Sequence, residues 1–249
     1  MIRFIATTFT LTFIGVIILG LLFIFLVKFN YNSLFGKDLR TIVLQFPTFV
    51  QLLNLNQPGD NRKAYLSSKY PIITVNSYYL ADSKPDSQMS SWIKDMISNT
   101  TGKTVTIETP RPLSFGNQAA FTDADLKQVG KSLAKPLISP ASLKLVYLST
   151  YAVKPSYLGI TLTRDTIFIF KKQLSSLEET PSVTARLEQS TLMHEWGHLL
   201  GLEHVPFSGC IMSADVETMD VRQLKEIDVP LTHCKDTLYD LEKLKTTYR

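Results

Sequence analysis

The sequence is poor in the residues that mark several specialised classes of protein. Its 249 residues include only two cysteines, which excludes a small scaffold held together by many disulfides. Eleven glycines and twelve prolines are too few for a collagen-like or low-complexity chain. No block of lysines and arginines stands out and the formal net charge is a mild +4, so we expect no nucleic-acid partner. A hydrophobic content of 45% excludes disorder of the whole chain and allows one large domain or two small ones.

Charge is missing altogether from residues 4–27, a run bounded by Arg3 and Lys28. As a helix this run would be about 36 Å long, enough for a hydrocarbon core of about 30 Å. It has three interpretations: an uncleaved anchor, a cleaved signal peptide, or a buried helix. We favour a transmembrane anchor over residues 1–28, because the apolar region of a signal peptide is shorter and ends at small residues.

The rest of the chain is predicted to contain a linker and one domain. Residues 29–64 read as a stalk or linker, because a short apolar stretch broken by Pro47 is followed by a polar loop. Residues 65–249 have the length of a single domain. Apolar periodicity and turn residues predict an α/β (α+β) fold. Strands are expected at 71–75, 103–108, 143–148, 159–163 and 166–170, and helices at 89–97, 122–134, 180–200 and 236–248.

The chemistry of the chain is concentrated in one motif, H-E-x-x-H-x-x-G-x-x-H, which spans residues 194–204 and holds three of the four histidines. His194 and His198 lie one helical turn apart on the same face, so their imidazoles can share one metal ion. Gly201 lets the chain leave the helix with a positive φ, which can bring His204 back as a third ligand. Three imidazoles and one open position are typical of catalytic zinc, and Glu195 is placed to act on a water molecule.

This motif resembles that of the metzincin clan of zinc endopeptidases, in which a methionine follows the third histidine in a tight turn beneath the metal. The segment Gly209–Ser213 contains Met212 at a spacing similar to the matrixin family, and Met219 is a weaker candidate. The resemblance implies a twisted mixed sheet with a backing helix, an active-site helix and a small C-terminal subdomain ending in a helix. It also implies one catalytic Zn²⁺ and a cleft-edge strand, assigned to residues 158–163, that pairs with extended substrate.

The sequence departs from the better-known members of the clan. Val205 follows the third histidine where those families place a diagnostic polar residue, so the subfamily stays open. No cysteine precedes Cys210, so the cysteine switch of a matrixin propeptide is missing. Cys210 and Cys234 could form a disulfide, stay as free buried thiols, or bind a second metal together with His233; the archaeal-type metzincins bind a second zinc through four further cysteines.

Taken together, the sequence predicts a membrane-anchored zinc endopeptidase in which Glu195 is the general base and His194, His198 and His204 hold the metal. The alternative is a catalytically silent zinc-containing module tethered to the membrane through residues 4–27. Local charge favours a cytoplasmic catalytic domain, whereas the resemblance favours an extracytoplasmic one, which we expect. Protein or peptide substrates are implied. The cleavage preference depends on residues 214–232, and neither it nor the oligomeric state can be read from the sequence.

Overall fold

The computed structural model describes residues 2–30, 33–115, 118–133, 141–176, 180–216 and 229–248. The chain divides into two compact units, Met1–Leu55 and Asn56–Arg249, and each has its own buried apolar cluster. The predicted boundary between residues 64 and 65 stays a prediction.

The first unit consists of helices. These are α1 (Ile2–Lys28), α2 (Leu34–Val43) and α3 (Pro47–Leu52). Ser33 starts α2 because its hydroxyl accepts a hydrogen bond from the backbone N–H of Gly36. The unit has a small core formed by Val27, Val43, Leu44, Val50, Leu53 and Leu55. Part of the stretch expected to be a stalk is therefore helical.

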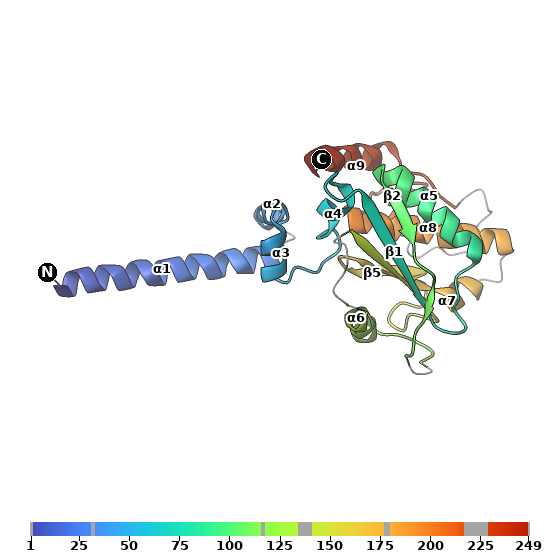
Figure 1. Cartoon of the computed structure of the whole chain (residues 1–249), viewed down its shortest axis with the longest axis horizontal. Helices are drawn as coiled ribbons and strands as arrows, with labels where there is room; N and C mark the ends of the chain where they lie inside the picture. The colour runs from blue at the N-terminus through green and yellow to red at the C-terminus, as the bar shows by residue number, and fades with distance from the viewer. Residues whose placement is uncertain are drawn as a thin grey trace. The chain divides into compact units, whose positions relative to one another are not determined.

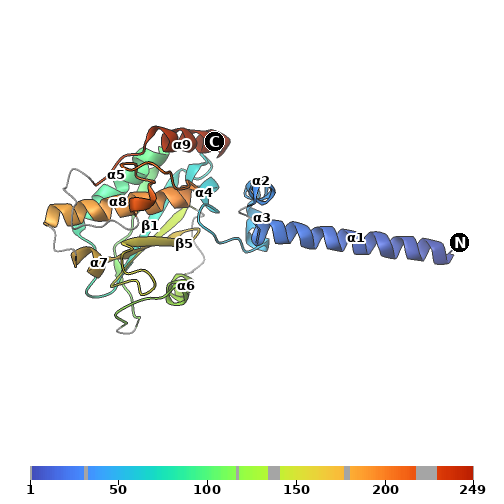
Figure 2. The same cartoon turned by 180° about the vertical axis from the view of Figure 1, so that it is seen from behind.

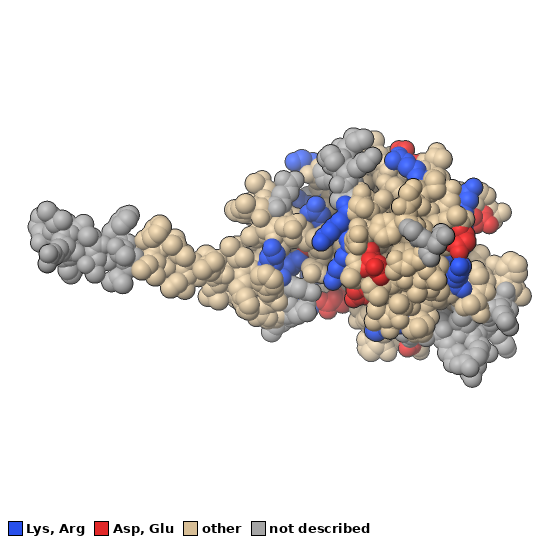
Figure 3. Space-filling view, turned by 90° about the horizontal axis from the view of Figure 1, so that it is seen from below, with Lys and Arg blue, Asp and Glu red and all other residues tan. Residues whose placement is uncertain are grey.

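The described side chains of α1 before Lys28 carry no charge and are largely exposed apolar groups (Figure 3). The apolar run begins at Phe4, and the side chains of residues 4–11 lie outside the described part of the chain. Among the described residues, no helix combines the length and the apolar character that crossing a membrane requires.

The second unit is built on a mixed sheet with the strand order β2-β1-β4-β6-β5, and β3 also pairs with β1. β5 lies at one edge and runs antiparallel to β6, whereas the other pairings are parallel. The strands are β1 (Ile72–Tyr79), β2 (Thr104–Ile107), β3 (Arg111–Pro112), β4 (Ser142–Leu148), β5 (Gly159–Thr163) and β6 (Thr166–Phe170). β4 is buried along its whole length, as expected for a central strand covered on both faces.

Helices cover the two faces of this sheet (Figures 1 and 2). One face packs against α5, α8 and α9, and the other against α6. Alternation along β4 explains the division: Leu145 and Tyr147 join the first core, whereas Val146 and Leu148 join the second. The helices of this unit are α4 (Arg62–Leu66), α5 (Ser87–Thr101), α6 (Asp123–Ser132), α7 (Lys171–Ser175), α8 (Pro181–Leu200), the 3-10 helix η1 (Ala214–Val216) and α9 (Lys235–Tyr248).

The elements that position the site follow the sequence closely. The structure places β5 and β6 at the expected residues, and α6 begins close to its expected start, with a capping box between Thr122 and Asp125. The mixed α/β fold is therefore confirmed. The short elements β3, α7 and η1 were not expected, because two to five residues carry too little periodic signal.

Candidate metal centre

Helix α8 carries two of the three histidines, and its ends explain where they lie. The hydroxyl of Thr180 accepts a hydrogen bond from Val183 N–H, and Pro181 occupies the first turn, where no backbone N–H is needed. The helix ends at Gly201, whose φ of 88° is in the left-handed region. Leu202 N–H then donates to the carbonyl of Gly197, and this Schellman-type exit turns the chain back over the last turn.

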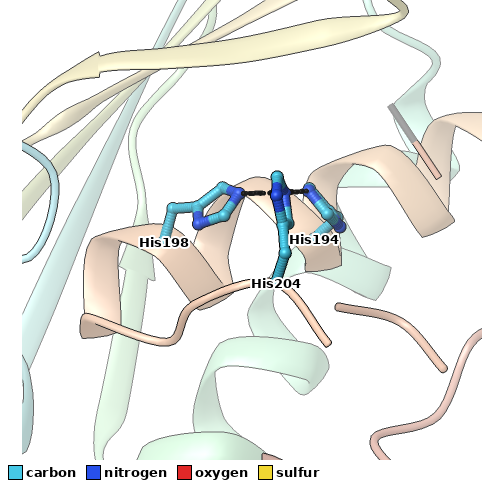
Figure 4. Close-up of side chains that lie close together, drawn as sticks. All are labelled: His194, His198 and His204. Carbon is cyan, nitrogen blue, oxygen red and sulfur yellow. Dashed lines mark hydrogen bonds between the residues drawn. The ribbon is translucent and has the colours of Figure 1, made fainter. Parts of the chain in front are cut away.

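The exit brings the three histidines of the motif together. His194 and His198 project from α8, and His204 reaches them from the segment that follows (Figure 4). The three Nε2 atoms are each 3.1 Å from the other two. Among the described residues, these three histidines form a group whose potential ligand atoms all lie within 4.8 Å of one another. His194 is almost fully buried and His204 is exposed, so solvent reaches the group from the side of His204.

The hydrogen bonds of the rings determine where their lone pairs point. His194 Nδ1 lies 2.7 Å from the carbonyl oxygen of Ile211, and His198 Nδ1 lies 3.1 Å from that of Leu202. A carbonyl oxygen only accepts, so each Nδ1 carries the proton. When these two rings are neutral, their Nε2 atoms therefore carry lone pairs that point to the shared centre, where one cation could bind both.

The dimensions of this triangle fit a zinc ion. Three nitrogens spaced 3.1 Å apart lie about 1.8 Å from the centre of their triangle, so an ion at the usual zinc–nitrogen distance of about 2.0–2.1 Å can contact all three from just above their plane. Metal-bound histidines commonly donate their other ring N–H to a backbone carbonyl, as His194 and His198 can here. Exposure at His204 leaves room for a fourth, exchangeable ligand.

Met212 packs against the segment of α8 that carries the first two histidines. Its side chain is fully buried, and a Cβ added to Gly197 would fall 2.3 Å from its sulfur atom. Gly197 lies on α8 between the first two histidines, so the missing side chain at this position makes room for the thioether. The role of Met212 beneath a metal, which the metzincin resemblance implies, stays a prediction. The weaker candidate, Met219, lies outside the described residues.

Both cysteines lie next to this methionine. Cys210 and Cys234 form a disulfide with Cα atoms 5.1 Å apart, so the described chain has no free thiol. Their sulfur atoms are therefore not available to a second metal. His233 is partly buried, and neither of its ring nitrogens has a hydrogen-bond partner in the structure. Burial lowers the pKa of His233 to about 4, and the charge of Lys245 adds to this effect.

Glu195 follows the first histidine and is 2% exposed. Its backbone carbonyl accepts a hydrogen bond of 3.4 Å from the hydroxyl of Thr161 on β5. α8 also approaches β5 closely at Gly159, where an added Cβ would fall 2.5 Å from Thr191 Cγ2. The edge strand thus runs beside the helix that carries the histidines, and among the described strands it pairs only with β6.

Residue identities alone could not reveal several parts of this site. The carbonyl groups of Ile211 and Leu202 orient two rings, but any residue supplies a carbonyl. Gly197 did carry a signal: a glycine inside a helix is unfavourable and commonly indicates a close approach by another group.

Comparisons with known proteins support the fold. No protein-family model matches the sequence, and no curated protein matches it. Archaemetzincin from Methanopyrus kandleri is 15% identical with a TM-score of 0.52, covering 71% of this chain and 97% of its own. Archaemetzincin from Archaeoglobus fulgidus, complexed with malonate, is 14% identical, and a zinc-dependent peptidase from Methanocorpusculum labreanum is 15% identical. Each has a TM-score of 0.46 and covers 67% of this chain and 99% of its own.

At such low identity the first of these likenesses shows a shared fold, a mixed sheet with helices on both faces like that of an archaemetzincin. It gives no support to a matrixin-like assignment, which depended on the spacing between His204 and Met212. That spacing alone does not separate the families of the clan.

Proposed function

We propose that this chain is a zinc-dependent endopeptidase. The observation that carries the proposal is the convergence of three Nε2 atoms at 3.1 Å, with two rings held by Nδ1–H bonds to carbonyl groups. One zinc ion bound there would polarise a peptide carbonyl and lower the pKa of a water molecule. The archaemetzincin-like fold supports the same assignment.

In this proposal Glu195 moves the proton. It follows His194 on α8, and its carboxylate accepts a proton from the attacking water and returns it to the leaving amine. The edge strand β5 binds the substrate backbone by adding it to the sheet as a further strand. Its position supports this role, because β5 is an edge strand and contacts α8 through Thr161 and Gly159.

Glu195→Gln tests the role of the carboxylate. We expect the variant to keep the zinc content of the wild type and to lose about 10²–10⁴-fold in turnover of casein, the usual contribution of general acid–base catalysis. Glu203→Gln is the matched control, since it removes an exposed carboxylate from the same motif, and it should keep both properties. Undiminished turnover in Glu195→Gln would remove Glu195 from the mechanism. Zinc binding without turnover in the wild type would favour the catalytically silent module.

His204→Ala tests the ligand set. We expect this substitution to reduce zinc content, because two imidazoles remain where three converge. The fourth histidine of the chain, His233, is the control, because it lies outside the cluster, and His233→Ala should keep zinc. An unchanged metal content in His204→Ala would show that the third ligand is another residue.

We further propose that the Asn56–Arg249 unit acts outside the cytoplasm. The Cys210–Cys234 disulfide supports this location, since such bonds persist in oxidising compartments. The membrane anchor over residues 4–27 stays a prediction from the sequence. An alkaline-phosphatase fusion at the C-terminus should be active if the unit is extracytoplasmic, and an inactive fusion together with a fluorescent green-fluorescent-protein fusion would refute that location.

A further inference from the structure

The turn formed by residues 210–213, called the 210–213 turn below, contacts the first predicted ligand, His194, and the helix position next to the second. The carbonyl of Ile211 accepts the Nδ1–H bond of His194 at 2.7 Å. The sulfur of Met212 fills the space beside Gly197, which directly precedes His198 on the helix. A displacement of this turn would therefore rotate the ring of His194 and disturb the packing under both helical ligands.

The same turn also supports the third ligand. Val205, the residue after His204, donates its backbone N–H to the carbonyl of Met212 at 2.9 Å, and it forms an isolated β-bridge with Ser213. The backbone of this short, buried turn thus bonds the ring of His194 and the residue after His204, and the Met212 side chain packs at the residue before His198.

A single covalent link fixes that piece of backbone. Cys210 is bonded to Cys234, and Cys234 N–H lies 3.3 Å from Cys210 Sγ. Two residues earlier, the carbonyl of Thr232 accepts a hydrogen bond from Ile211 N–H at 3.1 Å. Three residues later, at the start of α9, the buried hydroxyl of Thr237 lies 3.7 Å and 3.6 Å from the two sulfur atoms. The disulfide therefore anchors the 210–213 turn to α9.

We propose that the Cys210–Cys234 disulfide positions the metal ligands, so that its reduction weakens zinc binding by His194, His198 and His204. The inference rests on the proposed function, because it concerns the affinity of the same metal centre. Groups that orient metal-bound histidines typically change metal affinity about 10- to 100-fold when they are lost. Without the covalent link, the carbonyl of Ile211 is held only by backbone hydrogen bonds and packing.

The redox step needs an external two-electron reductant. With a dithiol, one thiolate attacks a sulfur of the disulfide and forms a mixed disulfide, and the second thiolate displaces the protein thiolate. The products are two cysteine thiols and one oxidised dithiol. With a water-soluble phosphine, the phosphorus takes up oxygen from water, and the two hydrogens of that water appear on the cysteine sulfurs.

The test compares the zinc affinity of the full chain with and without the disulfide. The double variant Cys210→Ala/Cys234→Ala removes the link without leaving thiols that could bind zinc, and zinc dissociation constants are measured by competition with a chromophoric chelator. We expect a dissociation constant about 10- to 100-fold higher than in the wild type. Leu126→Ala is the control for lost stability. Leu126 is fully buried on α6 in the other core, so its truncation should lower the melting temperature but change zinc affinity less than twofold.

A second experiment removes the disulfide by chemical reduction, without any substitution. The wild type is reduced with phosphine, alkylated with iodoacetamide, freed of both reagents and titrated with zinc while its tryptophan fluorescence shows that it is folded. It should match the double variant.

Zinc affinity within twofold of the wild type in either arm would overturn the proposal. Unfolding on removal of the disulfide in both arms would also overturn it, because the bond would then hold the fold rather than the metal centre. If the proposed zinc site itself is wrong, the result is distinguishable, because the oxidised wild type would then bind zinc no more tightly than His198→Ala.

Discussion

Gly197→Ala should disturb the metal centre through Met212. The added Cβ would lie 2.3 Å from Met212 Sδ and 3.1 Å from its Cε, well inside the usual contact distance of about 3.5–4.0 Å. Because Met212 is fully buried, the thioether cannot move into solvent. Overpacking of this kind costs about 1–3 kcal/mol. Alanine is about 1 kcal/mol better than glycine inside a helix, so the net loss of folding free energy is about 0–2 kcal/mol.

The double-mutant cycle with Met212→Ala isolates this contact. Met212→Ala alone should cost about 2–5 kcal/mol, because it empties a buried site. In that background Gly197→Ala no longer meets the sulfur and should stabilise the helix by about 1 kcal/mol. The two substitutions should therefore couple by about 1–3 kcal/mol: the double variant should be more stable than the sum of the two single losses of folding free energy implies.

Urea unfolding of the metal-free chain, followed by tryptophan fluorescence, measures these free energies. Both tryptophans, Trp92 and Trp196, lie in the Asn56–Arg249 unit, so the signal reports on that unit. Zinc titration of the same four proteins should show weaker binding by Gly197→Ala than by the wild type. Additive effects within about 0.5 kcal/mol would refute the contact between Gly197 and Met212 as the reason for a glycine at this position.

Two further predictions concern buried ionisable groups. The folded pKa of His233 is about 4, below the unfolded value of 6.5, so the unfolded state binds more protons between these values and stability should fall as the pH falls through this window. At pH 4.5 the loss should be about 2 kcal/mol relative to pH 7.5, and urea unfolding of metal-free His233→Gln should lack this part of the slope; equal slopes would refute the assignment. Lys144 Nζ lies 2.8 Å from Asp165 Oδ2 in a buried pair. Lys144→Met should therefore cost about 3–5 kcal/mol, because it removes the cationic partner of a buried carboxylate. Lys144→Met/Asp165→Asn should recover part of that loss, and an unchanged unfolding midpoint in the single variant would contradict the role of the pair.

The sequence predicted the long elements and the convergence of the three histidines well, because both depend on local patterns. The spacing of His194 and His198 places them on one face of any helix, and Gly201 with its positive φ is a local solution for the helix exit. The run Thr166–Phe170 is apolar, β-branched and aromatic, so its strand was visible without the fold.

The features that the sequence could not supply are tertiary. Which cysteine state occurs depends on the distance between two residues separated by 24 positions, and no local pattern fixes it. The carbonyl of Ile211 acquires its role only because the chain folds under α8. The strand order could not be predicted either. β4 lies between β1 and β6, and no local sequence pattern indicates which strands pair with it.

The order in which the pieces of the metal centre occur along the chain has a consequence for its biosynthesis. The imidazoles are translated first, the backbone that orients them follows a few residues later, and Thr232 and Cys234, which brace that backbone, leave the ribosome last. A nascent chain that stops short of residue 234 can form helix α8 and its two histidines yet lack their support. Metal uptake is therefore expected to be a late event in maturation, after the fold around the three histidines is complete.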